Sequence, residues 1–277
     1  MTDIDKVAKY WNARPCNVRH SSKVVGSVEY FDEVEAKRYF VEPHNPEFAE
    51  FSRWTGKRVL EIGCGIGTDT INFARYGAIV TAIDLSEASV TIARQRAQVF
   101  GLQGSIEIIQ GSAEDLDSIL CDDEKFDLIY SFGVIHHTPN PDKVFAQIAK
   151  HLAPGGEFRV MVYNKLSWRV LEILMQEKHP LKHLRNIDRL IAEYSEAQQG
   201  CPVTLAYTPA GFFRTLESHD LQVTDVKIRH IFPWKIDKYV KGQYDLKTLW
   251  KLVPKPIFNL LQNTIGWHLC YTAKARP

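Results

Sequence analysis

Short apolar runs alternate with segments of helical periodicity through the middle of the chain. Five runs are typical of strands that are buried on both faces: residues 58–62, 79–83, 106–109, 126–131 and 158–163. Between them, apolar residues recur about one helical turn apart in three segments: residues 68–76, 87–100 and 141–152. This alternation of strand and helix predicts a parallel sheet with right-handed crossovers.

The N-terminal segment has a different pattern, which predicts a helical cap or lid. Residues 1–56 are rich in aromatic and charged side chains, and Pro46 is placed to start a helix that runs to Trp54. We expect this segment to lie over a cleft in the core that follows it.

The pattern changes again after residue 164, where two insertions are predicted. Residues 165–204 predict a helical insertion that covers the cleft, and 235–265 form a second insertion that is basic and aromatic. The core would then comprise residues 57–164 and 205–277. Its last elements are expected to be a helix at 209–218 and strands at 221–230 and 267–274.

A glycine-rich turn follows the first predicted strand. Gly63, Gly65 and Gly67 come directly after it, and Asp84 closes the second strand. Glycine permits a tight turn and lets backbone approach a ligand closely, because no Cβ stands in the way. A carboxylate at the end of the second strand can accept both hydroxyl groups of a ribose. The sequence therefore predicts a nucleotide-type pocket at the carboxyl ends of parallel strands.

Two cofactor classes use this plan, namely dinucleotides and S-adenosylmethionine, and the spacing favours the second. The turn reads G-x-G-x-G, whereas the dinucleotide fingerprint is G-x-G-x-x-G/A, and position 68 here is Thr. Glu61 lies two residues before the first glycine. A carboxylate there would repel a pyrophosphate but suits the amino group and the sulfonium of S-adenosylmethionine.

Five ordered segments resemble the class I S-adenosylmethionine-dependent methyltransferases of small-molecule type. They read LEIGCGIGTD (60–69), AIDLS (82–86), GSAEDL (111–116), FDLIYSFGVIHHTPNP (126–141) and LAPGGEFRV (152–160). The resemblance covers residues 55–164 firmly and the C-terminal third loosely. It implies an α/β fold with a doubly wound, mostly parallel sheet of seven strands. In that fold the last strand enters antiparallel between the fifth and the sixth.

The candidate cofactor-binding residues follow from the turn and from the resemblance. The glycine turn with Cys64 would enclose the cofactor, Glu61 would face its methionine end, Asp84 its ribose and Leu85 its adenine. The resemblance places two further groups, near the adenine and along the methionine part respectively: Ser112, Ala113 and Glu114, then Ser131, Phe132 and Gly133.

Candidate catalytic residues come from the fourth strand and from the cap. His136 and His137 follow that strand, where a parallel sheet opens onto its ligand, and histidine can take a proton near neutral pH. Tyr30 could reach the methionine carboxylate or the substrate. The alternative is that these side chains form pocket wall or lid. No third ligand at suitable spacing accompanies the histidines, so a metal site is not expected.

Candidate acceptor-binding residues lie in the cap, at strand ends and in the insertions, where they could line a pocket: Arg19, His20, Tyr163, Asn164, Tyr207, His230 and Trp234. Residues 234–255 interleave lysines with aromatic side chains. Such a pattern can bind nucleic acid or an anionic membrane surface. A solvated amphipathic helix over the pocket is the interpretation we adopt, because acidic residues dilute the charge.

Composition narrows the function classes further. The 277 residues carry a formal net charge of +1, so no global charge favours nucleic acid, and no apolar stretch approaches the roughly 18 residues of a membrane span. The N-terminus lacks the apolar core of a signal peptide. Five scattered cysteines form no C-x-x-C pair, which favours a reducing cytoplasm over a disulfide framework.

We therefore expect an S-adenosylmethionine-dependent methyltransferase that acts on a small-molecule N, O, S or C nucleophile by in-line displacement. S-adenosylhomocysteine would be the second product. The alternatives are methylation of RNA, protein or a lipid or quinone acceptor, and a non-catalytic protein that binds the cofactor. An NAD-dependent enzyme is disfavoured by the glycine spacing.

Overall fold

The computed structural model describes residues 2–177, 187–198 and 201–276. One mixed sheet runs through the molecule in the strand order β3-β2-β1-β4-β5-β8-β7. The strands up to β5 are parallel, and β8 lies antiparallel between β5 and β7. The seven strands on this path are β1 Arg58–Ile62, β2 Ile79–Asp84, β3 Ile106–Gln110, β4 Phe126–Phe132, β5 Leu152–Asn164, β7 Leu221–Arg229 and β8 His268–Ala275.

This topology confirms the expected mostly parallel sheet with an antiparallel last strand. A two-residue strand that the sequence did not predict, β6 Ala206–Tyr207, pairs with the end of β5. Strand β5 begins at Leu152, six residues before the predicted start. It continues through Pro154 and Gly155, and Leu152 pairs with Phe126 ahead of a register shift in the ladder.

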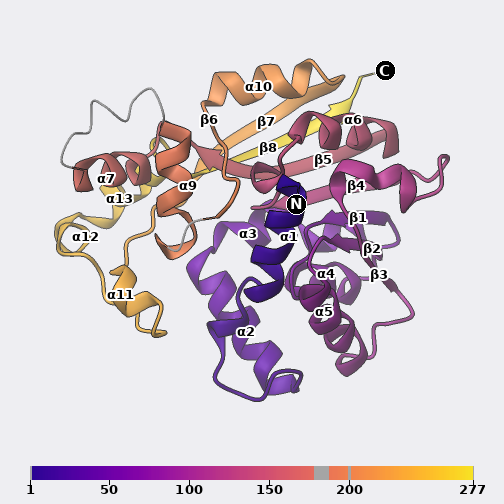
Figure 1. Cartoon of the computed structure of the whole chain (residues 1–277), viewed down its shortest axis with the longest axis horizontal. Coiled ribbons are helices and arrows are strands. Elements are labelled where there is room, and N and C mark those ends of the chain that lie inside the picture. The colour runs from indigo at the N-terminus through magenta and orange to yellow at the C-terminus, as the bar shows by residue number, and fades with distance from the viewer. Residues whose placement is uncertain (1, 178–186, 199–200, 277) are drawn as a thin grey trace.

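Helices cover both faces of the sheet and form a three-layer molecule (Figure 1). One apolar cluster joins α6 and α10 to the strands, and a second joins α4 and α5 to the opposite face. The strands are buried by both clusters, which explains their apolar runs. The bounds of these helices are α4 Thr68–Arg75, α5 Glu87–Val99, α6 Pro141–His151 and α10 Pro209–Glu217.

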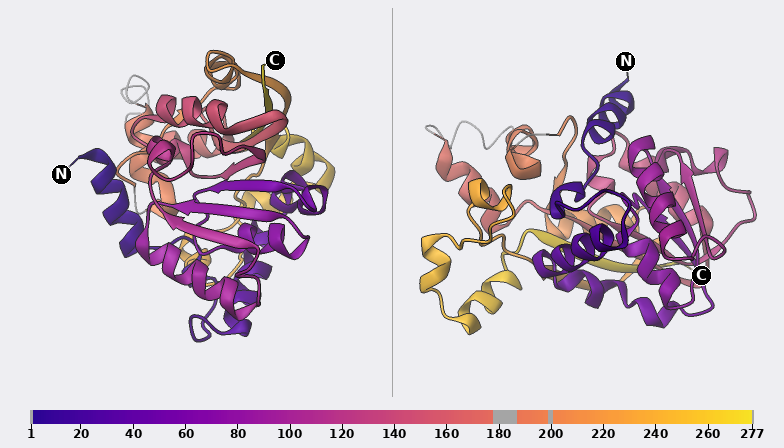
Figure 2. Two further views of the ribbon diagram at one scale, coloured as in Figure 1. Left: turned by 90° about the vertical axis from the view of Figure 1, so that its right-hand side faces the viewer. Right: turned by 90° about the horizontal axis from the view of Figure 1, so that it is seen from below.

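The N-terminal segment is helical, but its last helix is shorter than predicted. The expected helix from Pro46 to Trp54 ends at Ala49, and a separate 3₁₀ turn covers Phe51–Trp54. Glu50 breaks the helix with a left-handed φ of 50°, and its carboxylate accepts from the guanidinium groups of Arg53 and Arg159. The helices are α1 Asp3–Ala13, α2 Val28–Val41 and α3 His44–Ala49. Figure 2 shows α1 at the margin of the molecule.

The two insertions gather at one end of the sheet, away from β3 (Figure 1). They join through aromatic contact, since the rings of Trp168 and Trp250 lie 5.4 Å apart. The single amphipathic helix expected within 234–255 is instead two short helices, because a turn containing Gly242 and a bridge from Trp234 to Leu246 separate them. The helices are α7 Trp168–Gln176, α9 Ile187–Gln198, α11 Ile236–Tyr239, α12 Thr248–Leu252 and α13 Lys255–Gln262.

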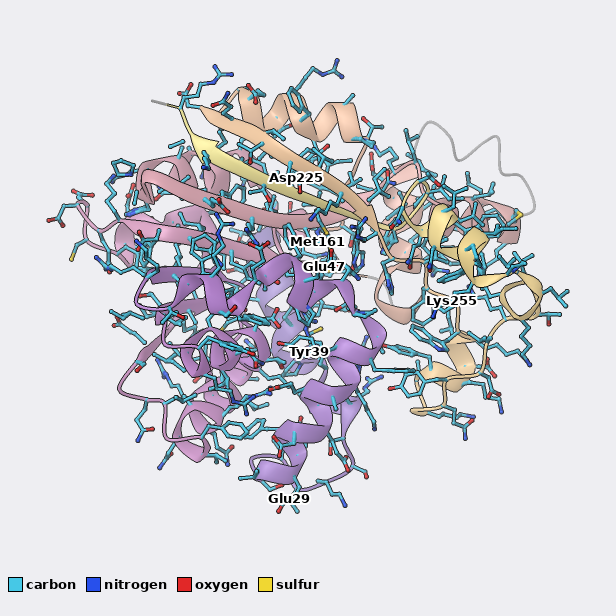
Figure 3. The ribbon with its side chains drawn as sticks, turned by 180° about the vertical axis from the view of Figure 1, so that it is seen from behind. Glu29, Tyr39, Glu47, Met161, Asp225 and Lys255 are labelled. Carbon is cyan, nitrogen blue, oxygen red and sulfur yellow. The ribbon has the colours of Figure 1, made fainter. Side chains whose placement is uncertain are left out.

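Figure 3 shows how far this insertion end reaches from the core. Tyr39 on α2 and Met161 on β5 lie within the body of the molecule, whereas Lys255 lies on the insertion beside it. Within the described residues, we find no helix with the length and apolar character needed to cross a membrane. The cellular location stays a prediction from the sequence.

Candidate functional site

The glycine turn joins β1 to α4 in a backbone conformation that other residues rarely adopt. Gly63, Gly65 and Gly67 have φ values of 76°, 55° and 77°. A Cβ on Gly63 would lie 2.3 Å from a methyl group of Val134, whereas one on Gly65 would meet open space. Glycine is therefore required at position 63 for close packing, and at position 65 for its φ.

Asp84 holds this turn from the end of β2. One of its carboxylate oxygens accepts from the backbone N–H of Gly65, and the other accepts from that of Ser86, both at 2.8 Å. Burial raises the pKa of Asp84, and these two backbone hydrogen bonds oppose the rise. The carboxylate is thus fixed at the carboxyl end of the sheet, where parallel folds of this type bind their ligands.

A cavity of about 270 Å³ opens over this turn. Strand ends and loops of the core line one side of it, while α1, the loop after it and α2 line the other. Ten of the predicted cofactor residues are in its lining: Glu61, Gly63, Cys64, Gly65, Asp84, Leu85, Ser112, Ala113, Phe132 and Gly133.

Three predicted cofactor residues lie outside this lining. Gly67 starts α4 and packs towards Ala93, so its role is in the turn itself. Ser131 is buried within β4. Glu114 does not face the cavity, because both of its carboxylate oxygens accept from Asn140, at 2.8 and 2.9 Å. In this structure, then, Ser112 and Ala113 reach the cavity from the third predicted motif.

Glu61 lines the cavity and is 4% exposed. It accepts a hydrogen bond from the hydroxyl of Thr70. Burial, together with the nearby charge of Asp69, raises the pKa of Glu61 to about 8, although the Thr70 hydrogen bond works against this. The carboxyl group is therefore largely protonated at neutral pH as long as no cation lies beside it.

Sequence reasoning missed a polar network centred on Asp69 in the first turn of α4. Its carboxylate accepts from Tyr39, Asn45 and Arg38, at 3.0, 3.0 and 3.3 Å. Asp69 and Arg38 both line the cavity. The network ties α2 and α3 to the glycine turn, so the cap and the core are held together at the site. Asp69 ends the LEIGCGIGTD motif, which was the available signal.

Of the three candidate catalytic residues, His137 reaches the cavity. Its Nδ1 lies 2.9 Å from the carbonyl oxygen of Val203, and its ring centre lies 5.5 Å from that of Trp11 on α1. A donor bond to a carbonyl fixes the proton on Nδ1 and leaves the lone pair on Nε2. His137 therefore has the chemistry of a proton acceptor at the cavity wall.

His136 and Tyr30 are placed elsewhere. His136 is fully buried, packs against Tyr163 with ring centres 3.8 Å apart and the rings tilted by 42°, and lines neither of the two cavities. Burial holds its pKa well below the ordinary value. Tyr30 packs beside Phe31, and its hydroxyl donates to the carbonyl of Val18 at 3.1 Å. Because both side chains are packed away from the cavities, this geometry does not support direct catalytic roles for them.

A second cavity of about 340 Å³ adjoins the first. The two share lining residues at their junction, among them Trp11, Glu42 and Tyr163. The outer part of the second cavity is formed by the loop after α1, by α7 and α9, and by the segment around α11. The N-terminal cap thus contributes to both cavities, while the glycine turn and the strand motifs lie in the first and the insertions mainly in the second.

Four of the seven predicted acceptor residues line this second cavity: Arg19, His20, Tyr163 and His230. Asn164 instead ties its own loop, since its side chain bonds to Gly266 and Leu166. Tyr207 packs against Phe212, and Trp234 packs among the aromatic residues of the second insertion. Asn164 therefore has a hydrogen-bonding role within its loop, and Tyr207 and Trp234 act in packing.

A cluster of buried histidines beside the second cavity was not predicted from the sequence. His230 and His268 line it, with ring centres 4.5 Å apart, and His44 Nε2 lies 2.9 Å from His268 Nδ1. Burial lowers the pKa of His44 and of His230, to about 2 and about 4. Among the described residues, no group of three or more His, Cys, Asp or Glu side chains could hold a metal ion.

Comparison with known proteins agrees with this geometry. Residues 55–223 match a family described as a methyltransferase domain. The chain is 32% identical over 168 residues to the ubiquinone biosynthesis O-methyltransferase of Pasteurella multocida (strain Pm70). This alignment covers 55% of this chain and 69% of that protein. Other curated proteins of that name align over 45% to 55% of their own length.

Solved structures share the fold at low sequence identity. Geranyl diphosphate C-methyltransferase from Streptomyces coelicolor A3(2) superposes with a TM-score of 0.61 and 14% identity, over 99% of this chain and 98% of that one. Magnesium protoporphyrin IX methyltransferase from Synechocystis PCC 6803, with bound S-adenosylhomocysteine, gives a TM-score of 0.58 and 15% identity over the whole of both chains.

Proposed function

Because the chain belongs to the methyltransferase-domain family, and is a class I S-adenosylmethionine-dependent methyltransferase of small-molecule type, we propose that its two cavities divide the reaction between them. The first cavity binds the cofactor S-adenosylmethionine, and the second binds the methyl acceptor. The observation that carries this assignment is the junction of the two cavities at Trp11, Glu42 and Tyr163.

Cofactor binding follows from the side chains that line the first cavity. Asp84 accepts the ribose hydroxyls, and the open space beside Gly65 lets the backbone approach the cofactor. The carboxyl group of Glu61 faces the methionine end, where its charge would balance the amino group. Leu85 and Ala113 provide apolar contact for the adenine. S-adenosylmethionine supplies the electrophilic methyl carbon.

The protein's own contribution is to orient the acceptor and exclude water. The second cavity places the acceptor at the junction, so that its nucleophilic atom and the methyl carbon approach in line. His137 is the proposed proton acceptor, since its Nδ1 is anchored on Val203 and its ring lies in the cavity wall. A nucleophile that carries no proton would not need this step.

Two measurements test the proposal. Calorimetric titration should give tight binding of S-adenosylmethionine and S-adenosylhomocysteine and none of NADH. Incubation with a library of small aromatic and aliphatic nucleophiles should then yield S-adenosylhomocysteine and a product heavier by one methyl group. Binding of the cofactor without turnover of any small molecule would contradict the assignment of the second cavity, and binding of NADH alone would contradict that of the first.

His137→Asn separates the two parts of the mechanism. The variant should bind the cofactor normally but lose turnover of hydroxyl acceptors about 10²-fold or more, as expected for removal of a general base. If His137→Asn turned over its acceptor at the wild-type rate, His137 would line the cavity without acting as the proton acceptor. His136→Asn serves as the comparison, because His136 lies outside both cavities.

A further inference from the structure

The second cavity carries an excess of positive charge. Four cationic side chains line it, on the loop after α1, on α2 and on α7: Arg14, Arg19, Lys37 and Arg169. Among the described residues, Glu42 is the carboxylate of this lining; it is 3.1 Å from Arg38, which also pairs with Asp69. A concave site lined by one sign of charge attracts a ligand of the other sign.

Arg169 is the best enclosed of these cations, with 12% of its side chain exposed. Its Nη2 donates to the carbonyl of Tyr194 at 3.1 Å, whereas its Nη1 is buried with no hydrogen-bond partner among the described residues. The Glu172 carboxylate is 3.7 Å from Nη1 but is itself held by Lys247, which bonds both of its oxygens at 2.8 Å.

A buried guanidinium whose Nη1 has only a carboxylate at 3.7 Å is incompletely hydrogen-bonded, so a further acceptor beside it would be stabilising. Arginine remains charged even where burial lowers its pKa, as it does for Arg169. A planar anionic group, such as a carboxylate or a phosphate, would match its donors in number and geometry. The donors of Arg169 therefore favour a ligand with an anionic group.

Aromatic side chains define the other half. Tyr163 and Trp267 stack in the cavity wall with ring centres 4.3 Å apart, and Phe232 and Tyr239 make an edge contact at 4.8 Å. Flat apolar walls of this kind fit an aromatic ring. Tyr163 and Tyr239 lie at the junction with the first cavity, whereas Arg169 lines the second cavity and not the first.

We propose that the methyl acceptor is an aromatic acid, with its anionic group on Arg169 and its ring between the aromatic walls near the cofactor. This proposal rests on the assignment of the second cavity to the acceptor. The anion binds away from the methyl donor, so it positions the ring and does not itself react. The shared chemistry is an aryl carboxylate or an aryl phosphate.

The test uses the full chain saturated with S-adenosylhomocysteine, in calorimetric titrations with three matched probes: 4-hydroxybenzoate, 4-hydroxyphenyl phosphate and the neutral 4-hydroxybenzamide. We expect one of the acids to bind at least tenfold more tightly than the amide, and the better acid identifies the anionic group. Equal affinity for acids and amide, or no binding of either acid, would overturn the proposal.

Arg169→Gln should abolish the preference for the acid while leaving the affinity for the amide unchanged. Arg169→Lys, which keeps the charge but loses the planar donors, should give an intermediate preference. Arg214→Gln on α10 is the matched control, since that residue lies outside both cavities. A preference for the acid that survives in Arg169→Gln would refute the assignment of the anion site.

The affinity for S-adenosylhomocysteine in each variant distinguishes failure of the anion-site proposal from failure of the proposed function. Retained cofactor binding with a lost acid preference supports the proposal, and retained binding with an unchanged preference contradicts it. If the wild-type protein did not bind S-adenosylhomocysteine, the proposed function would instead be contradicted. A fall in cofactor affinity in Arg169→Gln alone would mean that the side chain acts in packing.

Discussion

At the scale of single residues, Asp84 holds the backbone turn and is the residue that we propose to bind the ribose. Its replacement by Ala should remove charged hydrogen bonding of about 1.5–3 kcal/mol from the complex, which lowers cofactor affinity at least tenfold. Calorimetric titration with S-adenosylhomocysteine measures this directly. Because Asp84 also holds Gly65 and Ser86, part of the loss would come from the turn. An unchanged affinity in the folded variant would remove Asp84 from the ribose site.

The raised pKa of Glu61 predicts that binding of the cofactor releases a proton. Burial and the charge of Asp69 raise its pKa to about 8, so the carboxyl group is protonated at pH 7 in the free protein. A cationic amino group beside it would favour the ionised form and release the proton. Affinity for S-adenosylmethionine should therefore rise with pH from 6 to 8. Binding heats at pH 7 in phosphate and in Tris should differ by up to one proton's ionisation heat, and Glu61→Gln should remove that difference.

At the scale of elements, α1 lines the first cavity, and hydrogen bonds of one of its side chains help to hold it on the core. Asn12 accepts from the hydroxyl of Ser86 and the backbone N–H of Ala88, at 3.0 and 3.1 Å, and so pins α1 to the start of α5. Asn12→Ala should speed dissociation of S-adenosylhomocysteine about three- to tenfold, since each hydrogen bond contributes about 0.5–1.5 kcal/mol. Lys9→Ala, exposed on the same helix, is the control. Equal dissociation rates by stopped flow would mean that α1 does not gate release.

The elements that the sequence predicted well are those whose signals are local. The strands and helices between residues 58 and 163 carry their own periodicity and turn chemistry, and the structure confirms them with the boundary change at β5. The break at Glu50 could not be predicted, because it depends on an ion pair with Arg159, which lies 109 residues along the chain. Long-range partners of this kind override local propensity.

The candidate site divides in the same way. The glycine turn and Asp84 are defined by consecutive residues, so their place in the cavity followed from spacing. Glu114 belongs to a recognisable motif, yet its side chain is oriented by hydrogen bonds from Asn140. No pattern in the sequence connects these two residues. His44 and His268 are 224 residues apart and meet only through the fold. The second cavity, built by the cap and the insertions, was therefore beyond prediction in detail.

At the scale of the whole molecule, buried histidines should make the fold sensitive to acid. Folding lowers the pKa of five histidines below the ordinary 6.5, chiefly by burial: His20, His44, His136, His230 and His268. Below pH 6.5 the unfolded chain therefore binds more protons than the folded protein. The stability from these groups is fully present above pH 6.5 and is lost as the pH falls.

Two carboxyl groups act in the opposite direction. Burial raises the pKa of Glu61 and of Asp84 on folding, so they favour the folded state as the pH falls. Because the five histidines outnumber these two carboxyl groups, the unfolded chain still binds more protons than the folded protein, and the free energy of unfolding falls as the pH drops below 6.5. We therefore expect urea unfolding midpoints to fall steeply between pH 6.5 and 5.5, with the highest stability near neutral pH.

His230 offers a substitution that isolates one of these protons. Its backbone has a left-handed φ of 69°, which Asn also tolerates, so His230→Asn removes the titrating ring without forcing the turn. Because one proton fewer then distinguishes the folded and unfolded states, the slope of unfolding free energy against pH should flatten by about 1.4 kcal/mol per unit below pH 6.5. If His230→Asn unfolds with the wild-type slope, that ring is not buried in its neutral form, and the acid sensitivity of this fold must come from other groups.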